Sequence, residues 1–172
     1  MAFKAKGSIN PHGAPVLKKA IITNSVVVDE LDSVKITSGF AALGTAGALV
    51  FGHVMAISSN KGLGLNTSGA TGAQMGSFTN SYTAASNNQT VGKVKVEVDI
   101  SKYSLYSVDP DVAIGTTTGS NLLGYKTDLA SEVRTDEDTA TTSTAQYTIW
   151  GVDDVVPANQ VVSIYESQVF GV

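Results

Sequence analysis

The stretch Gly92-Lys93-Val94-Lys95-Val96-Glu97-Val98-Asp99-Ile100 decides the fold class of this chain. Every even position from Val94 to Ile100 is apolar, and every odd position from Lys93 to Asp99 is charged. Alternate side chains of a β-strand point to opposite faces, so the segment predicts a strand with one face in the core and one face in water. A helix does not fit, because a period of two would scatter the apolar groups around its axis.

Short apolar or alternating runs separated by turn residues predict further strands on both sides of this stretch. They lie at 26–28, 34–40, 48–57, 78–83, 103–106, 146–152 and 161–170. Tyr147 and Ile149 are expected on one side of their strand, with Trp150 opposite. The best helical candidate, Leu129 to Arg134, is only a turn or two long. We therefore expect an all-β protein, a small β-barrel or β-sandwich.

Composition limits the possible partners. The 172 residues suit one domain, which we place at 21–172, and a net charge of −4 argues against a nucleic-acid partner. The absence of cysteine excludes disulfides and thiolate metal sites. No apolar run approaches the ~20 residues that cross a bilayer, and the N-terminus lacks the apolar region of a secretory signal. Charged residues make up 15% of the chain, which suits a surface partly covered by neighbours.

Residues 1–20 are interpreted as an extended N-terminal arm. They contain four lysines, no acidic residue, and a density of glycine and proline that prevents a helix. The arm is either a disordered tail or a segment that becomes ordered on a partner, with apolar side chains filling pockets and lysines meeting carboxylates. The expected partner-binding residues are Phe3, Lys4, Lys6, Ile9, Pro11, Pro15, Leu17, Lys18 and Lys19.

Residues 58–90 form a long insertion rich in Gly, Ser, Thr and Asn, with Lys61 as its one charged residue. A loop of this length inside a compact domain usually binds something or is disordered. We interpret it as packing against a neighbouring subunit, the alternative being a flexible surface loop. Its expected contact residues are Leu63, Leu65, Met75 and Phe78.

The sequence carries no recognisable catalytic motif. A serine nucleophile elbow, G-x-S-x-G, is absent, and the two histidines are His12 in the arm and His53 in an apolar run. We expect His53 to be a hydrogen-bonded core side chain. The segment Asp109-Pro110-Asp111 is first of all a turn, although paired carboxylates can also hydrolyse glycosides. We therefore expect neither enzymatic activity nor a cofactor.

An acidic segment runs from Asp128 to Asp138. Clustered carboxylates are the ligands that Ca²⁺ takes, but the glycine and terminal glutamate of an EF-hand loop are missing at the required spacing. The two interpretations are a calcium site and a solvated acidic face.

Several segments resemble the small head proteins of tailed bacteriophages, specifically the decoration or cement proteins that sit on the assembled capsid. The resemblance rests on residues 32–36, 39–40, 52–54, 98–101, 106–107, 114–125, 150–153 and 167–171, and it covers about 30 to 172. It implies a β-barrel or β-sandwich, often trimeric, that binds the major capsid protein on the outer surface of the virion where capsomers meet.

Two other functions stay open at this stage. One is a different virion part, such as a tail or fibre-base β module. The other is a carbohydrate-binding β-sandwich, for which Tyr103, Tyr106 and Trp150 are the candidate sugar-stacking rings. The alternative for those rings is core packing.

Overall fold

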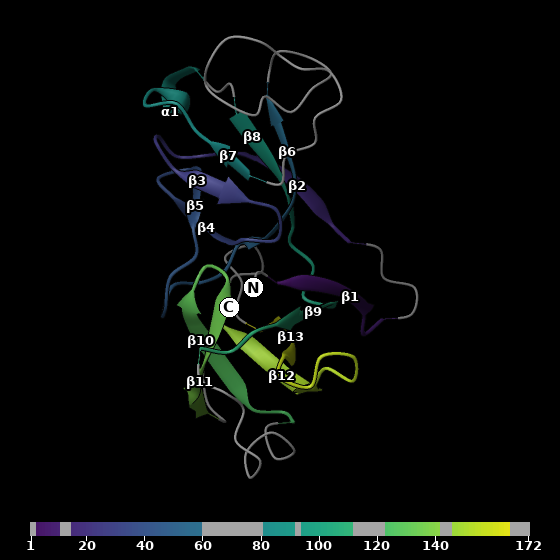
Figure 1. Ribbon diagram of the computed structural model, residues 1–172. Coiled ribbons are helices and arrows are strands. Elements are labelled where there is room, and N and C mark those ends of the chain that lie inside the picture. The colour runs from purple at the N-terminus through teal and green to yellow at the C-terminus, as the bar shows by residue number, and fades with distance from the viewer. Residues whose placement is uncertain are drawn as a thin grey trace.

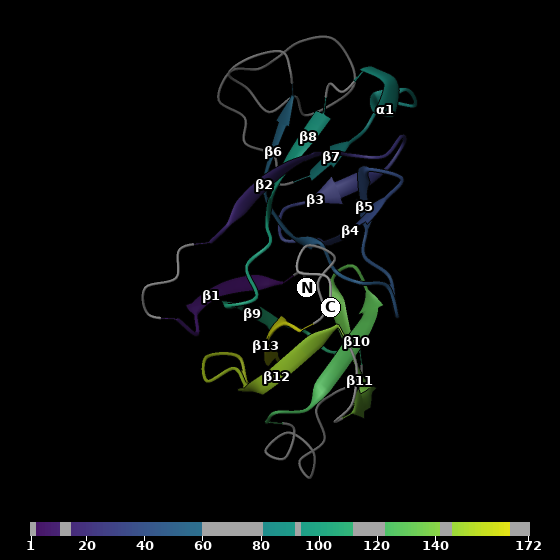
Figure 2. The same ribbon diagram turned by 180° about the vertical axis from the view of Figure 1, so that it is seen from behind.

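The computed structural model describes residues 3–10, 15–59, 81–91, 94–111, 123–141 and 146–165. These residues form antiparallel sheets and one short helix, which confirms the expected all-β class. Two large sheets lie one above the other in Figure 1, and Figure 2 shows the same arrangement from behind. Among the described strands neither sheet closes into a barrel, so the barrel alternative is wrong.

The lower sheet has six strands in the order β1-β9-β13-β12-β10-β11. Their bounds are β1 Lys4–Ser8, β9 Ser104–Val108, β10 Lys126–Ser131, β11 Arg134–Thr141, β12 Tyr147–Val152 and β13 Gln160–Ile164. Every neighbouring pair in this sheet is antiparallel. The strand that follows the N-terminus thus forms one edge, and the β10–β11 hairpin forms the other.

The upper sheet has five strands in the order β2-β8-β6-β4-β5, and a separate β3–β7 ladder accompanies it. The bounds are β2 Leu17–Ile21, β3 Val27–Asp29, β4 Ser33–Thr37, β5 Phe40–Leu43, β6 Gly52–Ser59, β7 Ser81–Thr83, α1 Asn88–Val91 and β8 Val94–Asp99. Ser38 and Gly39 join β4 to β5 with φ angles of 50° and 83°. Positive φ at both positions is the signature of the type I′ hairpin turn.

Each sheet packs on its own hydrophobic core. The predicted alternation in β8 is confirmed for the upper core, since Val96, Val98 and Ile100 are buried there. The lower core contains Tyr147 and Ile149 from β12, while Trp150 is exposed on the opposite side, as expected. The other members of the lower core are Phe3, Val50, Tyr106, Val108, Leu129, Val162 and Ile164.

The described part of the N-terminal segment is not a detached arm. β1 pairs with β9 in the lower sheet, and β2 pairs with β8 in the upper sheet, so this one segment supplies an edge strand to each. Phe3 is completely buried in the lower core. The arm interpretation fails because backbone pairing and burial of Phe3 with partners distant in sequence outweigh the glycine and proline content.

The acidic segment is a hairpin and not a helix. β10 and β11 pair on either side of a turn at residues 132–133, with Thr127 and Leu129 buried. The helical candidate at 129–134 was wrong, because this range holds the end of β10, the turn and the start of β11. Two of the buried positions beside it are Thr127 and Thr135, and a period-two pattern built on threonine is harder to read than one built on valine.

Candidate partner-binding site

Eight of the predicted partner-binding residues lie in the described part of the chain. Seven of them are exposed, and the eighth, Phe3, is buried. The seven exposed residues are Lys4, Lys6, Ile9, Pro15, Leu17, Lys18 and Lys19. Phe3 is corrected: its ring packs on His53 and Tyr147, so it cannot reach a partner. The remaining predicted residues, Pro11, Leu63, Leu65, Met75 and Phe78, lie outside the described part of the chain.

Five exposed apolar residues gather where β1 ends and β2 begins. We name Ile9, Pro15, Val16, Leu17 and Tyr103 the N-terminal patch. The backbone holds them near one another, since the amide of Ile9 donates to the carbonyl of Tyr103, and Ile100, three residues earlier, donates to the carbonyl of Val16. Leu17 and Tyr103 are 47% and 58% exposed.

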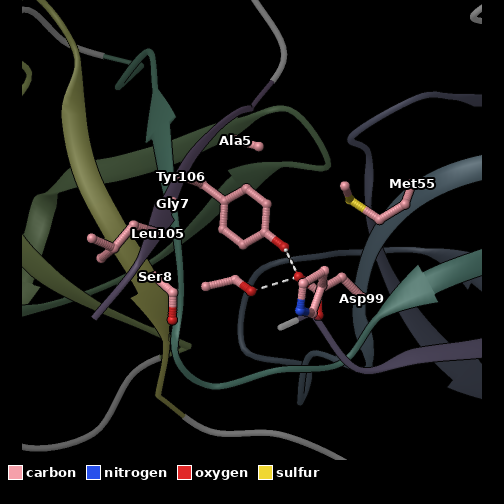
Figure 3. Close-up of a pocket in the computed structure, with 9 residues that line it drawn as sticks. Ala5, Gly7, Ser8, Met55, Asp99, Leu105 and Tyr106 are labelled. Carbon is pink, nitrogen blue, oxygen red and sulfur yellow. Dashed lines mark hydrogen bonds between the residues drawn. The ribbon is translucent and has the colours of Figure 1, made fainter. Parts of the chain in front are cut away.

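A pocket of about 250 Å³ adjoins this patch between the two sheets. Its apolar walls are Met55, Leu105 and Pro15, and its polar wall consists of Asp99, Ser104 and Tyr106. Figure 3 shows the hydroxyl of Tyr106 directed at Asp99, with Met55 projecting from β6. Met55 is the extra residue of a β-bulge in β6, and a bulge turns such a side chain out of the regular alternation.

Asp99 organises the polar wall. Its Oδ2 accepts hydrogen bonds from Ser104 Oγ at 2.6 Å and from the Tyr106 hydroxyl at 2.8 Å. Its Oδ1 accepts from the backbone amides of Ser101 at 2.9 Å and Val16 at 3.2 Å. One carboxylate at the end of β8 therefore fixes the start of β2, the link to β9 and the ring of Tyr106.

Next to this pocket, a set of buried polar side chains joins the two sheets by hydrogen bonds. The Tyr147 hydroxyl lies between Ser33 Oγ and His53 Nε2, while Nδ1 of His53 lies 3.2 Å from the carbonyl oxygen of Leu31. Because a carbonyl only accepts, Nδ1 carries the proton and Nε2 accepts from Tyr147. Burial lowers the pKa of His53 to about 4, so the ring is neutral, and the expectation of a hydrogen-bonded core histidine is confirmed.

The chain formed by Ser33, Tyr147 and His53 does not form a catalytic centre. All three side chains are completely buried, so no substrate reaches the serine. Burial also raises the pKa of Tyr147 far above its ordinary value, which keeps the hydroxyl protonated as a donor. The arrangement stabilises the contact between the two sheets.

The candidate sugar-stacking rings do not form one platform. Tyr106 is buried, so it cannot stack on a sugar. Trp150 is 44% exposed in β12 and donates its indole N–H to Ser163, while Tyr103 belongs to the N-terminal patch. Core packing is thus correct for Tyr106 and wrong for Tyr103 and Trp150.

Two charged residues of the acidic segment, Asp128 and Arg134, have partners outside it. Asp128 accepts from the backbone amide of Gln146, and Arg134 pairs with Asp109 at 3.1 Å. Within the described ranges, no three metal-ligating side chains converge on a point that would hold an ion. Of the helical residues described, none forms a helix long and apolar enough to cross a membrane.

Comparisons with known proteins give no relative for this chain: no family model, curated protein or solved structure matches it.

The pocket was not predicted from the sequence. Ile9 and Leu17 were predicted as partner contacts from their isolated spacing, and Pro15 as part of the same segment; all three are exposed, and their contact with a partner stays a prediction. Met55 and Ser104 carried no signal, because their roles depend on a bulge and on a contact between two sheets. Asp99 was expected in water, yet it is only 2% exposed because β1 and β9 cover that end of β8.

Proposed function

We propose that the protein is a virion structural protein that decorates the outside of an assembled phage head, binds the major capsid protein at capsomer junctions and stabilises the shell. The observation that carries the proposal is the N-terminal patch. It consists of five exposed apolar residues just after β1, at the start of β2 and just before β9, on a protein whose own two cores are already filled. Exposed apolar clusters of this kind mark surfaces that another protein covers.

The flanking charges support a protein partner of opposite sign. Lys18 and Lys19 follow Leu17 in β2, and Lys19 is 67% exposed although it pairs with Glu97. The chain as a whole has a net charge of −4, so this basic edge is local. An apolar centre with a charged rim is the usual build of a protein–protein interface.

The proposed role follows from simple energetics. A ligand that binds only the closed shell stabilises it by its binding free energy, and many copies on one symmetric lattice add their effects. Because decoration proteins, which the sequence resembles, are often trimeric, we also propose that the protein is a homo-oligomer, commonly a trimer. Sedimentation of the purified protein measures its oligomeric state directly.

The test uses capsids that lack the protein, and variants of the patch. Deleting residues 1–20 is unsuitable, because it would remove β1, β2 and Phe3 from the fold. The variants Leu17→Ser and Tyr103→Ser change exposed side chains only, and each is expected to weaken co-sedimentation with capsids at least tenfold. Leu123→Ser, at a position 62% exposed just before β10, which lies four strands away from β1 in the six-stranded sheet, is the matched control.

Two outcomes would overturn the proposal. If wild-type protein neither co-sediments with capsids nor raises the temperature at which they break, it is not a decoration protein. If it binds tails or fibre bases in purified particles and not the head lattice, the alternative virion role is correct.

A further inference from the structure

We infer that the pocket beside Asp99 binds a primary ammonium group carried on an apolar stem, and that its occupant is a lysine side chain of the capsid protein. The choice of occupant rests on the proposed function, whereas the affinity for an ammonium group does not. Three features of the pocket lead to this assignment: its charge, its hydrogen-bonding character and its size.

The first feature is a buried carboxylate that takes part in none of the ion pairs found among the described residues. Asp99 is almost fully buried, and its four hydrogen-bond donors are the neutral groups of Val16, Ser101, Ser104 and Tyr106. The ion pairs found among the described residues involve Lys6, Lys19 and Arg134, and none of them reaches Asp99. Buried carboxylates are normally compensated by a positive charge. The pocket wall is therefore locally negative.

The second feature is that the two hydroxyls bonded to Asp99 offer a ligand only acceptor lone pairs; the hydroxyl of Ser8, which also lines the pocket, accepts from the amide of Asn10 and keeps its own proton. The hydroxyl protons of Ser104 and Tyr106 are both committed to Oδ2 of Asp99. What each hydroxyl oxygen offers to a ligand is its remaining lone pairs. An ammonium group has three donors and no acceptor, so it matches such a wall, whereas a carboxylate or phosphate would be repelled.

The third feature is size and lining. A volume of about 250 Å³ falls below the roughly 300–1,000 Å³ of sites for drug-sized ligands, and it suits a single long side chain. Met55, Leu105 and Pro15 line the route to Asp99 with apolar groups. The four-carbon stem of lysine packs on such groups while its charge stays at the polar end. The exposed N-terminal patch continues this apolar surface outward.

The direct test is a titration of the ¹⁵N-labelled protein with n-butylammonium chloride, followed by NMR. We expect millimolar binding that moves the amide signals of Ser8, Met55 and Ser104. The matched controls are n-butanol, which lacks the charge, and sodium butyrate, which reverses it. Butanol should bind at least tenfold more weakly, and butyrate should cause no shift. Equal binding of butanol or butyrate would overturn the assignment.

A second test fills the pocket from within the chain. Met55→Lys places an ammonium group on the residue that already points into the pocket, and Met55→Gln and Met55→Glu are its neutral and anionic counterparts. We expect Met55→Lys to have the highest melting temperature of the three variants, Met55→Gln the next and Met55→Glu the lowest. The same three substitutions at the exposed neighbour Ala56 control for the general preference of an acidic protein for a cation. Their melting temperatures should differ from one another less than those of the three Met55 variants do. An equal spread at both positions would contradict the assignment.

Capsid binding separates this inference from the proposed function. If a capsid lysine occupies the pocket, Met55→Lys should lose capsid binding at least tenfold, while Ala56→Lys should not. If Met55→Lys still binds capsids while Leu17→Ser does not, the lysine assignment is wrong and the proposed decoration role is unaffected. If Met55→Lys instead changes the sedimentation of the protein alone, the occupant is a second copy of this chain, and the assignment to the capsid protein is wrong.

Discussion

The hydroxyl oxygen of Tyr147 in β12 lies 3.1 Å from Nε2 of His53 in β6, and this contact joins the six-stranded sheet to the five-stranded sheet. The same hydroxyl lies 2.9 Å from Ser33 Oγ in β4. The rings of Phe3 and Tyr106 pack around the imidazole, with centroid separations of 4.3 and 4.1 Å. The boundary between the two sheets at this point is therefore a buried, hydrogen-bonded core.

Tyr147→Phe is predicted to destabilise the protein by about 1–3 kcal/mol, because it leaves His53 Nε2 and Ser33 Oγ buried without their partner. Urea denaturation followed by tryptophan fluorescence measures the change. Tyr103→Phe removes a hydroxyl from an exposed ring and should have no comparable effect. A Tyr147→Phe protein as stable as wild type would show that the hydroxyl chain contributes nothing net.

Acid is predicted to weaken the fold through His53. Burial lowers its pKa from 6.5 to about 4, so between these values the unfolded chain binds a proton that the native state does not. Stability must then fall as the pH falls from 6.5 to 4, by on the order of 3 kcal/mol. Asp32 acts in the opposite direction, since burial raises its pKa from 3.8 to about 7.

Comparison with His53→Gln isolates the histidine from Asp32 and from the other carboxylates. Unfolding free energies of both proteins are measured by urea denaturation at pH 7 and pH 4.5. Wild type should lose more stability over this interval than the variant does. Equal losses would mean that His53 titrates normally in the native state.

Gly52→Ala is predicted to cost more than about 3 kcal/mol or to prevent folding. A Cβ atom there would overlap the carbonyl oxygen of Asp99 and lie 2.6 Å from Cγ1 of Val98, so the β6–β8 ladder would have to shift. Gly44→Ala meets only the side chains of Ser33 and Leu129, which can move, and should cost less. Thermal melts that rank Gly44→Ala as the more damaging change would contradict this packing.

Lys6→Met is predicted to cost about 1–3 kcal/mol, because it leaves the buried carboxylate of Asp153 without its charged partner at 2.7 Å. Burial alone would raise the pKa of Asp153, but hydrogen bonds from Lys6, Ser107 and two backbone amides hold it below its usual range. Lys19→Met breaks an exposed pair and should change stability by about 0.5 kcal/mol or less. Equal effects of the two substitutions in urea denaturation would refute this difference.

The sequence allowed the strands with strong apolar alternation to be predicted. Val96, Val98 and Ile100 face the upper core as their spacing indicated, and Tyr147 and Ile149 face the lower one. These positions follow from a local rule, since the period of a strand fixes which side chains share a face. The buried, hydrogen-bonded state of His53 was predicted for the same reason, from its place inside an apolar run.

What escaped prediction depends on contacts between distant parts of the chain. β1 and β2 each contain two lysines, and β1 also contains a glycine, so only their pairing with β9 and β8 makes them strands. The pocket required the bulge at Met55 and the covering of Asp99 by a second sheet. No local pattern encodes either feature, because both arise where the two sheets meet.

The placement of β1 and β2 also has a consequence for synthesis on the ribosome. Lys4 pairs with Ser107 and Leu17 with Asp99, so both strands emerge from the exit tunnel about eighty to a hundred residues before their partners. The backbone edges of both strands stay unsatisfied until then, and Phe3 has no complete core to enter until β12 and β13 have been made. Both strands are thus segments that a holding chaperone would contact, and co-translational folding of the lower core is completed only after β13 has been made.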